Sequence, residues 1–329
     1  MGALLEVSGL SVEIMTTRGI VNAVRDVSLT VEKGTTHGLV GESGCGKSVT
    51  ARTIMGLNER RLIRVKGQIM FEGKDLLPLS DKEMANVRGR RIGMIFQDPV
   101  SALNPLFKIG DQVAEVFVRH FGDSKAEAKK KTLALLERVG ILPAEVRYSQ
   151  YPFEFSGGML QRVVIAAAIA ANPPLIIADE PTTALDVTIQ AQILELLQEL
   201  QRELGLAILL ITHNFGIVSE VCDRVSVMYA GTILETGDKK DILLSPMNRY
   251  SRALIDSIPA RGSAGQSMRT IPGAPPELFE RLPGCPFAPR CASSADVCFN
   301  EQPRLVPYPP AYGVSRLAAC HFPEGAVEA

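Results

Sequence analysis

The sequence predicts an α/β fold built on a mostly parallel sheet with helices on both faces. Two apolar runs, "LIIAD" and "LAILLITH", have the length and composition of buried strands, and the segment between them, "VTIQAQILELLQELQREL", has helical periodicity. A third short apolar strand leads through the glycine-rich turn "GESGCGKS" into another helix. Apolar strands that alternate with helices are typical of parallel sheets, because the crossover helices cover both faces.

The N-terminal segment, residues 1 to about 33, alternates apolar and polar side chains. Such alternation predicts antiparallel strands with one face in water. Residues 98 to about 160 instead have helical periodicity, with Ser124 as an expected N-cap, and they predict a helical subdomain inserted in the α/β domain. The helix between the two apolar strands is expected to begin after Asp186 and to end at Gly205.

The composition changes beyond residue 257, where proline, glycine, serine and cysteine replace the periodic runs. We therefore expect a main domain over residues 1–257 and a loop-rich C-terminal extension over residues 258–329. The 35 Lys and Arg nearly cancel the 36 Asp and Glu, so no general affinity for nucleic acid is expected. No apolar run is long enough to cross a bilayer and the N-terminus lacks signal-peptide character, which together predict a cytoplasmic protein.

The stretch from Gly41 to Ser48 matches the pattern G-x-x-x-x-G-K-[ST] between a predicted strand and a predicted helix. Glycines in this pattern let successive backbone amides point inward and hold phosphates at the N-terminus of the helix. We expect Lys47 to contact the β- and γ-phosphates and Ser48 to ligate Mg²⁺. The residues expected to contact a nucleotide here are Gly41, Glu42, Ser43, Gly44, Cys45, Gly46, Lys47, Ser48 and Val49.

The strand "LIIAD" carries Asp179 at its end, and Glu180 follows directly. The carboxyl end of a parallel strand is where ligands bind in open α/β sheets. We expect Asp179 to hold Mg²⁺ and Glu180 to orient and polarise the water that attacks the terminal phosphate. Together with the phosphate loop, this acidic pair predicts a nucleotide hydrolase.

The segment "FSGGMLQR" places Ser156, Gly157 and Gly158 at the start of a predicted helix, which is a second helix N-terminus suited to an anion. One nucleotide does not need two such helices from one chain. In this order of motifs the sequence resembles the ATP-binding cassette (ABC) family, in which this signature reaches across a head-to-tail dimer to the ATP of the other subunit. The resemblance implies a P-loop NTPase fold with an antiparallel N-terminal β subdomain, and ATP and Mg²⁺ as cofactors.

The resemblance also assigns residues outside the phosphate loop. Gln97 in "FQDP" resembles the Q-loop glutamine, which contacts Mg²⁺ and the water, and Asp186 in "TTALD" resembles the D-loop aspartate at the dimer seam. His213 in "ITHN" resembles the switch histidine that contacts the γ-phosphate. Ile14 stands where the family usually has an aromatic residue against adenine, so apolar contact alone is expected there. The implied catalytic residues are Glu180, His213, Gln97 and Lys47.

A narrower resemblance covers nearly the whole chain. The segments "FQDPVSALNP", "DEPTTALD" and "SPMNRYSRALIDSIP", followed by a tail with cysteines, resemble the ATPase subunits of oligopeptide, dipeptide and nickel importers. This implies an ATP-hydrolysing subunit that powers import of peptides or a related small solute. The implied partners are two transmembrane permease subunits, a second ABC ATPase that is identical or related and, indirectly, an extracytoplasmic solute-binding protein. The implied location is the cytoplasmic face of the inner membrane, as a peripheral subunit with no nucleic-acid partner.

The predicted extension contains Cys285, Cys291, Cys298 and Cys320, separated by five, six and 21 residues. These spacings match neither common zinc sites nor the ferredoxin run, yet a segment that lacks its own core needs a staple such as a metal to become ordered. The importer resemblance implies a 4Fe-4S cluster on these cysteines, with zinc as the second interpretation and free thiols as the third. His321, beside the last cysteine, is expected to be a surface residue, with a supporting contact to the cluster ligands as the alternative.

Two functions of other classes compete with the importer hypothesis. The first is a soluble ABC ATPase that acts on ribosomes or nucleic acid; such proteins usually have tandem cassettes or long inserts, whereas this chain has one phosphate loop, one signature and no basic face. The second is a redox-regulated ATPase with the cysteine tail as sensor. Unchanged ATPase and transport rates after oxidation of the tail would argue against that second function.

Overall fold

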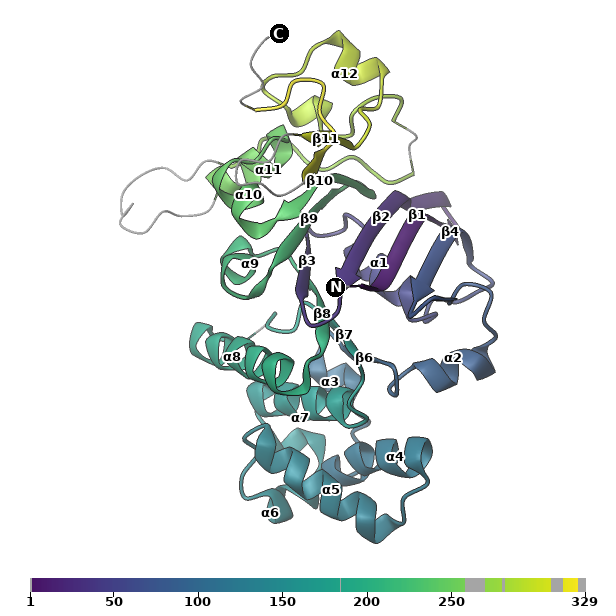
Figure 1. Cartoon of the computed structure of the whole chain (residues 1–329), viewed down its shortest axis with the longest axis vertical. Helices are drawn as coiled ribbons and strands as arrows, with labels where there is room; N and C mark the ends of the chain where they lie inside the picture. The colour runs from purple at the N-terminus through teal and green to yellow at the C-terminus, as the bar shows by residue number, and fades with distance from the viewer. Residues whose placement is uncertain (1, 184, 258–269, 280–281, 309–315, 325–329) are drawn as a thin grey trace. The chain divides into compact units, whose positions relative to one another are not determined.

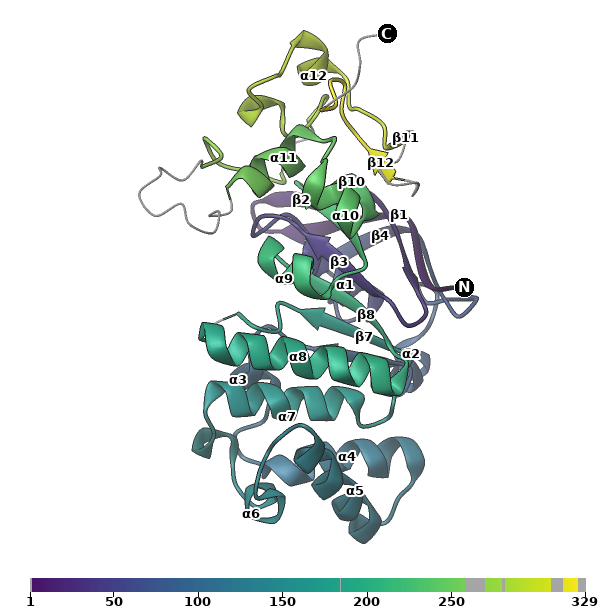
Figure 2. The same cartoon turned by 60° about the vertical axis from the view of Figure 1, so that its left-hand side comes forward.

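The computed structural model describes residues 2–183, 185–257, 270–279, 282–308 and 316–324. The chain forms two compact units (Figures 1 and 2). The helical unit consists of Met1–Leu4, Val31–Thr35 and Pro78–Ile211, and the β-rich unit consists of Leu5–Thr30, Thr36–Leu77 and Thr212–Ala329. The domain boundary expected at residue 258 falls in the segment 258–269, outside the described residues, and stays a prediction.

A parallel sheet forms the core of the helical unit. Its strands are β6 (Ile92–Ile95), β7 (Leu175–Asp179) and β8 (Ala207–Thr212), and all of their residues are buried. β7 pairs in parallel with β6 on one side and with β8 on the other. The carboxyl ends of the three strands therefore lie at one edge, and the parallel sheet expected from the apolar runs is confirmed.

Helix α8 (Val187–Leu204) connects β7 to β8. It begins at the expected cap, because the carboxylate of Asp186 accepts a hydrogen bond from the backbone amide of Ile189. It ends at Gly205, whose φ of 63° is the left-handed conformation that glycine adopts most easily. Five apolar side chains on one face are buried; they are Ile193, Leu194, Leu196, Leu197 and Leu200.

The remaining helices of this unit form its helical part. They are α2 (Asp81–Val87), α3 (Pro99–Ala102), α4 (Ile109–Phe121), α5 (Lys125–Arg138), α6 (Ala144–Tyr148), the 3₁₀ turn η1 (Pro152–Glu154) and α7 (Gly157–Ile169). Figures 1 and 2 both show α4 beside α5, and α7 beside α8. α5 starts at a capping box in which the Ser124 hydroxyl accepts from the Glu127 amide and the Glu127 carboxylate accepts from the Ser124 amide.

The β-rich unit contains an antiparallel sheet with the strand order β2-β1-β4-β5. The strands are β1 (Ala3–Thr16), β2 (Gly19–Glu32), β4 (Ile63–Phe71) and β5 (Lys74–Asp75). β1 runs antiparallel to β4 in a register that places Leu5 opposite Phe71 and Ile14 opposite Ile63. The alternation of buried and exposed residues along β2 confirms the strands expected from the N-terminal pattern.

A second group of hydrogen-bonded strands in this unit has the order β3-β9-β10-β12-β11. Its strands are β3 (Thr36–Val40), β9 (Arg224–Tyr229), β10 (Thr232–Asp238), β12 (Arg316–Ala318) and β11 (Val306–Tyr308), and the unit's helical segments are α1 (Lys47–Ile54), α9 (Phe215–Val221), α10 (Lys239–Leu244), α11 (Arg249–Asp256), η2 (Ala288–Arg290) and α12 (Asp296–Asn300). β3 is parallel to β9, whereas the other pairs are antiparallel.

The described part of the extension is more regular than its loop-rich composition suggests. β12 pairs with β10, with Glu235 opposite Ala318, and thereby extends the sheet of the main domain. The Asn248 side-chain amide strengthens this junction by donating to the carbonyl oxygen of Ala319 at 2.7 Å. An exposed strand edge needs a partner or a cover, and the extension supplies one for β10.

Within the described ranges, no helix combines the length and the apolar character that crossing a membrane requires.

Candidate functional site

The shape of the loop after β3 depends on glycine. Gly41 follows the buried strand with φ of 156°, and a Cβ at this position would lie 2.0 Å from the carbonyl oxygen of Met228. Gly46, the N-cap of α1, has φ of 108°, and a Cβ there would lie 2.3 Å from the carbonyl oxygen of Ala23. Both neighbours are backbone atoms, so no side-chain movement relieves the clash. A glycine is therefore required at both ends of the turn.

Lys47, the first residue of α1, lies with its ammonium group against this loop. Its Nζ donates to the carbonyl oxygen of Gly41 at 2.7 Å and to that of Glu42 at 2.9 Å. The side chain is 4% exposed, so a buried positive charge lies at the N-terminal end of a helix. This arrangement suits a phosphate anion, which can take over the contacts of the ammonium group.

The other residues of the loop differ in exposure. Ser43 and Gly44 are exposed at its tip, and Ser48 and Val49 are half-buried in the first turn of α1. Cys45 is buried, and this burial raises the pKa of its thiol although Lys47 lies nearby. Solvent therefore reaches the loop at its tip, whereas the lysine side chain is enclosed.

Ile14 and His213 also belong to the β-rich unit. Ile14 is half-buried in β1, opposite Ile63 of β4. His213 is exposed directly after β8, and Asn214 caps α9 by accepting from the backbone amide of Gly216 at 2.8 Å. Asn214 thus serves as a good N-cap. The expected roles of Ile14 and His213 toward adenine and the γ-phosphate stay predictions.

In the helical unit, Glu180 lies at the end of β7 with its carboxylate held from two sides. The amide nitrogen of Gln97 donates to its Oε2 at 3.0 Å, and the Thr183 hydroxyl donates to the same oxygen at 2.8 Å. Glu180 is 8% exposed, and neighbouring Asp179 is 3% exposed. Two buried carboxyl groups at a strand end, one of them fixed by hydrogen bonds, form an arrangement able to hold a divalent cation and orient a water molecule.

The backbone at Glu180 is strained. Its φ is 46°, in the left-handed region that residues with a Cβ rarely adopt, and its amide donates to the carbonyl oxygen of Ile211 at 2.9 Å. Such conformations cost about 1–3 kcal/mol and persist where the surrounding structure enforces them, often at functional sites. The strain is an independent indication that the position of this carboxylate matters.

The N-termini of α7 and α8 lie close together, with the Ile189 side chain of α8 packed against Gly158 of α7. Ser156 caps α7 by accepting from the Met159 amide, and Asp186 caps α8 by accepting from the Ile189 amide. Gly158 in the first turn of α7 lies so close to Ile189 that a Cβ would be 2.7 Å from its Cγ2. Ser156 and Gly157 are exposed residues, so this helix N-terminus is accessible to an anion.

The residues expected at the nucleotide thus fall into one set in each unit. The helical unit brings together Gln97 and Glu180, next to Asp179, and fixes the caps at Ser156 and Asp186. The β-rich unit brings together the residues of the phosphate loop. Their roles toward ATP and Mg²⁺ remain predictions.

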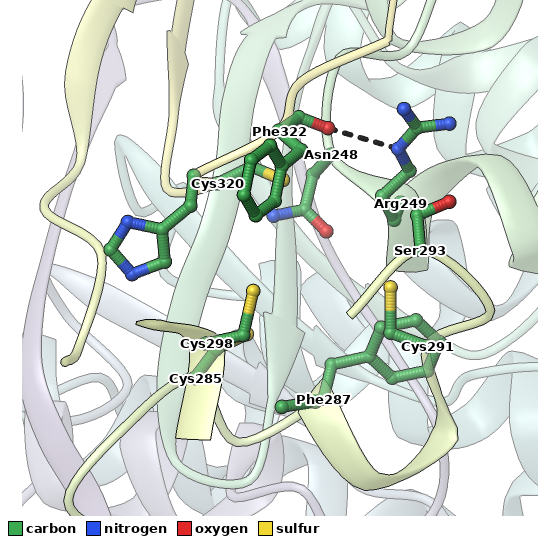
Figure 3. Close-up of a pocket in the computed structure, with 11 residues that line it drawn as sticks. Asn248, Arg249, Cys285, Phe287, Cys291, Ser293, Cys298, Cys320 and Phe322 are labelled. Atoms are coloured by element: carbon green, nitrogen blue, oxygen red, sulfur yellow. Dashed lines mark hydrogen bonds between the residues drawn. The ribbon is translucent and has the colours of Figure 1, made fainter. Parts of the chain in front are cut away.

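The four late cysteines line one cavity in the β-rich unit (Figure 3). The amide of Cys285 donates to the carbonyl oxygen of Cys298 at 2.7 Å, which brings two segments of the extension together. Gly284 makes this approach possible, because a Cβ there would lie 2.2 Å from the same carbonyl oxygen. Figure 3 shows Cys291 and Cys320 on the other sides of the cavity, with Arg249 donating to the carbonyl oxygen of Phe322 nearby.

The thiols of this cavity match the donor chemistry of a metal cluster. Burial raises the pKa of Cys285 to about 11, and it raises the pKa of Cys291 and of Cys320 as well. Binding a metal would require these thiols to lose their protons. Within the ranges described, however, no three His, Cys, Asp or Glu side chains are arranged to hold one metal ion, so the zinc and cluster interpretations are not demonstrated.

His321 bonds through Nε2 to the carbonyl oxygen of Glu301 at 2.9 Å. Its ring lines the cysteine cavity while this nitrogen is engaged elsewhere. The surface residue expected from the sequence therefore has a structural contact.

Three residues that contact the two sites were missed by the sequence analysis. Thr183 holds the Glu180 carboxylate, and a threonine three residues after an acidic residue in a turn is a weak signal that was available. Arg290 pairs with Glu42, and the Tyr250 hydroxyl accepts from the Glu42 amide at 3.1 Å. No local pattern links Arg290 or Tyr250 to a loop more than 200 residues earlier.

Comparison with known families agrees with this arrangement. The model of the ABC transporter family matches residues 24–183, and the model described as the oligopeptide/dipeptide transporter C-terminal region matches residues 234–298. The first match covers the phosphate loop and Glu180. The second covers three of the four cysteines of the cavity.

Curated relatives match over most of the chain. The dipeptide transport ATP-binding protein DppD of Bacillus subtilis is 51% identical over 304 residues, which are 92% of this chain and 91% of the relative. The oligopeptide transport ATP-binding protein OppD of Salmonella typhimurium is 47% identical over 320 residues, which are 97% of this chain and 94% of the relative.

Solved structures give the same family. The dimeric ATP-binding cassette MJ0796, in a post-hydrolysis state bound to ADP and Pi, superposes with a TM-score of 0.64 and 27% identity over 71% of this chain and 98% of that one. The structure of cbiO1 from Clostridium perfringens, part of the cbiONQ transporter complex, has a TM-score of 0.62 and 28% identity over 74% of this chain and 92% of that one. The chain therefore belongs to the ABC transporter family and, within it, to the ATP-binding proteins that carry the oligopeptide/dipeptide transporter C-terminal region.

Proposed function

We propose that this chain is the ATP-hydrolysing subunit of a membrane importer for dipeptides or oligopeptides. The observation that carries the proposal is the near-complete match to peptide transport ATP-binding proteins of about half-identical sequence. The glycine-dependent phosphate loop and the fixed carboxylate of Glu180 support it, because they are the two parts that hydrolysis of ATP needs.

In the proposed reaction, backbone amides of residues 41–48 and the ammonium group of Lys47 bind the phosphates of ATP. Ser48 of the β-rich unit and Asp179 and Gln97 of the helical unit are the residues that would hold Mg²⁺, which would supply positive charge to offset the negative charge of the phosphates. Glu180 orients the attacking water and accepts its proton, while its hydrogen bonds to Gln97 and Thr183 fix the carboxylate. Catalysis of this kind depends mainly on positioning and charge stabilisation.

The proposal includes a second ATPase subunit, either a copy of this chain or a relative. Ser156, Gly157 and Gly158 at the start of α7 would bind the γ-phosphate held by that subunit, with His213 acting on the phosphate of its own subunit. Asp186 would lie at the seam between the two subunits. Each ATP-binding site would then contain residues of both chains, so that ATP binding closes the dimer and hydrolysis reopens it.

Two transmembrane permease subunits complete the proposed transporter, and an extracytoplasmic binding protein delivers the peptide. The chain would act at the cytoplasmic face of the inner membrane. The helical part of the chain, residues 98–160, would transmit closure to the permease. In the same proposal, residues 1–257 form the nucleotide-binding domain and residues 258–329 form the accessory extension.

The importer proposal is tested by purifying the chain with its co-expressed permease subunits and reconstituting the complex in liposomes. Stable co-purification and ATP-dependent peptide uptake are expected, with hydrolysis stimulated by the loaded binding protein. Co-purification with ribosomes or RNA, together with no uptake, would contradict the proposal and favour the soluble ATPase.

We also propose that Cys285, Cys291, Cys298 and Cys320 hold a 4Fe-4S cluster. The shared cavity supports it, because four thiols line one space in the described structure. Four cysteine thiolates are the ligand set that 4Fe-4S clusters use, so these residues have the donor chemistry to hold one. When bound, the cluster would supply the cross-links that a core-poor segment lacks.

Anaerobic purification followed by iron and acid-labile sulfide assays tests the cluster. About four irons and four sulfides per chain are expected from the cluster type. Cys298→Ser should lose the iron, whereas Cys222→Ala, a buried cysteine outside the cavity, should retain it. Colourless protein with stoichiometric zinc would show that the cluster assignment is wrong.

A further inference from the structure

The extension contacts the phosphate loop through one ion pair. Arg290, the last residue of η2, lies between Cys285 and Cys291 in the sequence. Its NH1 donates to Oε2 of Glu42 at 2.7 Å and its NH2 donates to Oε1 at 3.1 Å. The ion pair is bidentate. It is also shielded from solvent, since the side chains of Arg290 and Glu42 are 6% and 24% exposed. Glu42 is the second residue of the phosphate loop.

Arg290 is itself fixed by further contacts in the same unit. Its Nε donates to the carbonyl oxygen of Pro272 at 2.8 Å, and its NH1 donates to the hydroxyl of Tyr229 at 3.1 Å. Phe287, three residues earlier, packs edge-on against Tyr229 with 5.5 Å between ring centroids. It also packs against Tyr250 at 5.2 Å. The turn between the two cysteines is thus anchored on the strand that supports the loop.

Glu42 is held on three sides by these groups. Its carboxylate binds Arg290, its amide donates to the Tyr250 hydroxyl, and its carbonyl oxygen accepts from Lys47. The lysine expected to bind phosphate therefore rests on a residue whose side chain is fixed by the extension. Removing the guanidinium group would leave a half-buried carboxylate without its partner, and the loop would move to rehydrate it.

We propose that Arg290 is a positioning residue through which the cysteine-bearing extension holds the phosphate loop ready for nucleotide. The proposal rests on the assignment of residues 41–48 to phosphate binding. It couples two sites, so the effect is reciprocal: nucleotide in the loop stabilises the turn Phe287–Cys291, and disorder in that turn weakens nucleotide binding. The extension then contributes to ATP binding, in addition to any role of its cysteines in ordering the extension itself.

A contact that only stabilised the fold would have a different effect on the kinetic constants. Loss of a stabilising contact lowers the free energy of unfolding and reduces the amount of active protein. The KM of the protein that remains folded is unchanged. Loss of a positioning contact raises KM for ATP because the loop must be ordered at the moment of binding. It changes kcat little, since bound phosphates hold the loop afterwards.

The test is steady-state ATP hydrolysis by the full-length protein in its transporter complex, comparing Arg290→Met with wild type. KM for ATP is expected to rise about tenfold with kcat within twofold, since a hydrogen-bonded charge pair of this kind contributes about one order of magnitude in affinity. Arg290→Lys keeps the charge without the two-pronged geometry and should fall between the two. Arg304→Met, the same change at an exposed arginine of the extension, is the matched control and should leave both constants unchanged.

A double-mutant cycle with Glu42→Gln separates direct coupling from general damage. Glu42→Gln alone should raise KM to a similar extent, and the double variant should be no worse than either single one. Additive effects, or an unchanged KM in Arg290→Met, would overturn the inference.

Hydrogen exchange provides a readout that does not depend on turnover. Mg-ADP should slow amide exchange in Phe287–Cys291 of the wild-type protein, and Glu42→Gln should abolish this protection although it lies outside the extension. Protection that persists in Glu42→Gln would also overturn the inference. If wild type itself bound no nucleotide, the assignment of the phosphate loop would fail first, and that outcome is visible in the same titration.

Discussion

The phosphate loop and the cysteine cavity are both irregular segments of the β-rich unit, but different forces determine their shapes. Backbone contacts fix the loop: a Cβ at Gly41 or Gly46 would lie within 2.3 Å of a carbonyl oxygen. Side chains dominate the cavity, where four thiols face a shared space and burial opposes ionisation of at least three of them. The shape of the loop therefore depends on backbone contacts, whereas the cavity is bounded by side chains.

This difference follows from how much core each region has. The loop follows the fully buried β3 and leads into α1, five of whose eight residues are buried. Of the described residues after 269, only a few with apolar side chains are buried; they are Pro286, Phe287, Ala288, Cys298, Ala318 and Ala319. So small a core stabilises a segment weakly, and cross-links through a metal cluster would have to supply the rest.

Gly41→Ala is the largest expected perturbation of the loop. The added methyl group would collide with a backbone carbonyl, so we expect the affinity for ATP to fall at least about a hundredfold, corresponding to several kcal/mol of strain. Equilibrium titration with a fluorescent ATP analogue measures it. Gly122→Ala is the matched control, because Gly122 has φ of 72° with open space around it and lies at the end of α4. Equal affinities for Gly41→Ala and wild type would show that the loop is not shaped by backbone contact.

Replacing one of the proposed cluster ligands is expected to act first on the extension and, through Arg290, on the phosphate loop. In Cys298→Ser, hydrogen exchange across residues 285–308 and 316–320 should accelerate about a hundredfold if a cluster is bound as proposed, because metal binding would then be linked to folding. Exchange in the buried strand β3 should stay slow, whereas the phosphate loop should loosen because Arg290 no longer fixes Glu42. Unchanged exchange in the extension would mean that the cysteines are ordinary free thiols in a segment that is stable without a ligand.

Acid should weaken the strand that supports the loop. Burial, with a further contribution from Arg224, lowers the pKa of His37 in β3 to about 4, and its Nε2 bonds to the Ser226 hydroxyl at 2.8 Å. The unfolded chain binds this proton below about pH 6.5, whereas the folded protein binds it only near pH 4, so stability falls as the pH drops between these values. From pH 7 to pH 5 the loss is about 2 kcal/mol. Urea unfolding at both pH values, with His37→Gln as the comparison, measures it; an equal pH dependence in both proteins would contradict the assignment.

Thr183→Val is the smallest of these perturbations. It removes one hydrogen bond to the Glu180 carboxylate, so kcat should fall about tenfold while KM for ATP changes less than twofold. Thr183→Ser restores the hydroxyl and should restore the rate. If the valine and serine variants hydrolysed ATP equally fast, the hydroxyl would have no part in positioning Glu180.

The contrast between the two regions also explains what the sequence could predict. Requirements that act over a few residues were visible: the glycine spacing of the phosphate loop, the apolar run before Asp179, and the caps at Ser124 and Asp186. Each follows from local backbone geometry or from the burial of one strand.

Requirements that join distant segments were not visible. The pairing of β12 with β10 and the contact between Arg290 and Glu42 depend on how the extension folds back on the sheet. No periodicity or spacing in the sequence predicts these two contacts, because a three-residue strand or a single arginine could pair with many other segments of the chain. The cysteine spacing is ambiguous for a similar reason, since separations of five, six and 21 residues do not determine which thiols meet in space.

Glu180→Gln tests the central claim, hydrolysis of ATP by a water that Glu180 orients, most directly. The change keeps the shape of the side chain and its contact with Thr183 but removes the proton acceptor. Turnover is expected to fall at least about a hundredfold while Mg-ATP still binds with wild-type affinity, so the variant should elute as a nucleotide-bound dimer in size-exclusion chromatography. Undiminished turnover by this variant would contradict the role of Glu180 and the mechanism derived from it.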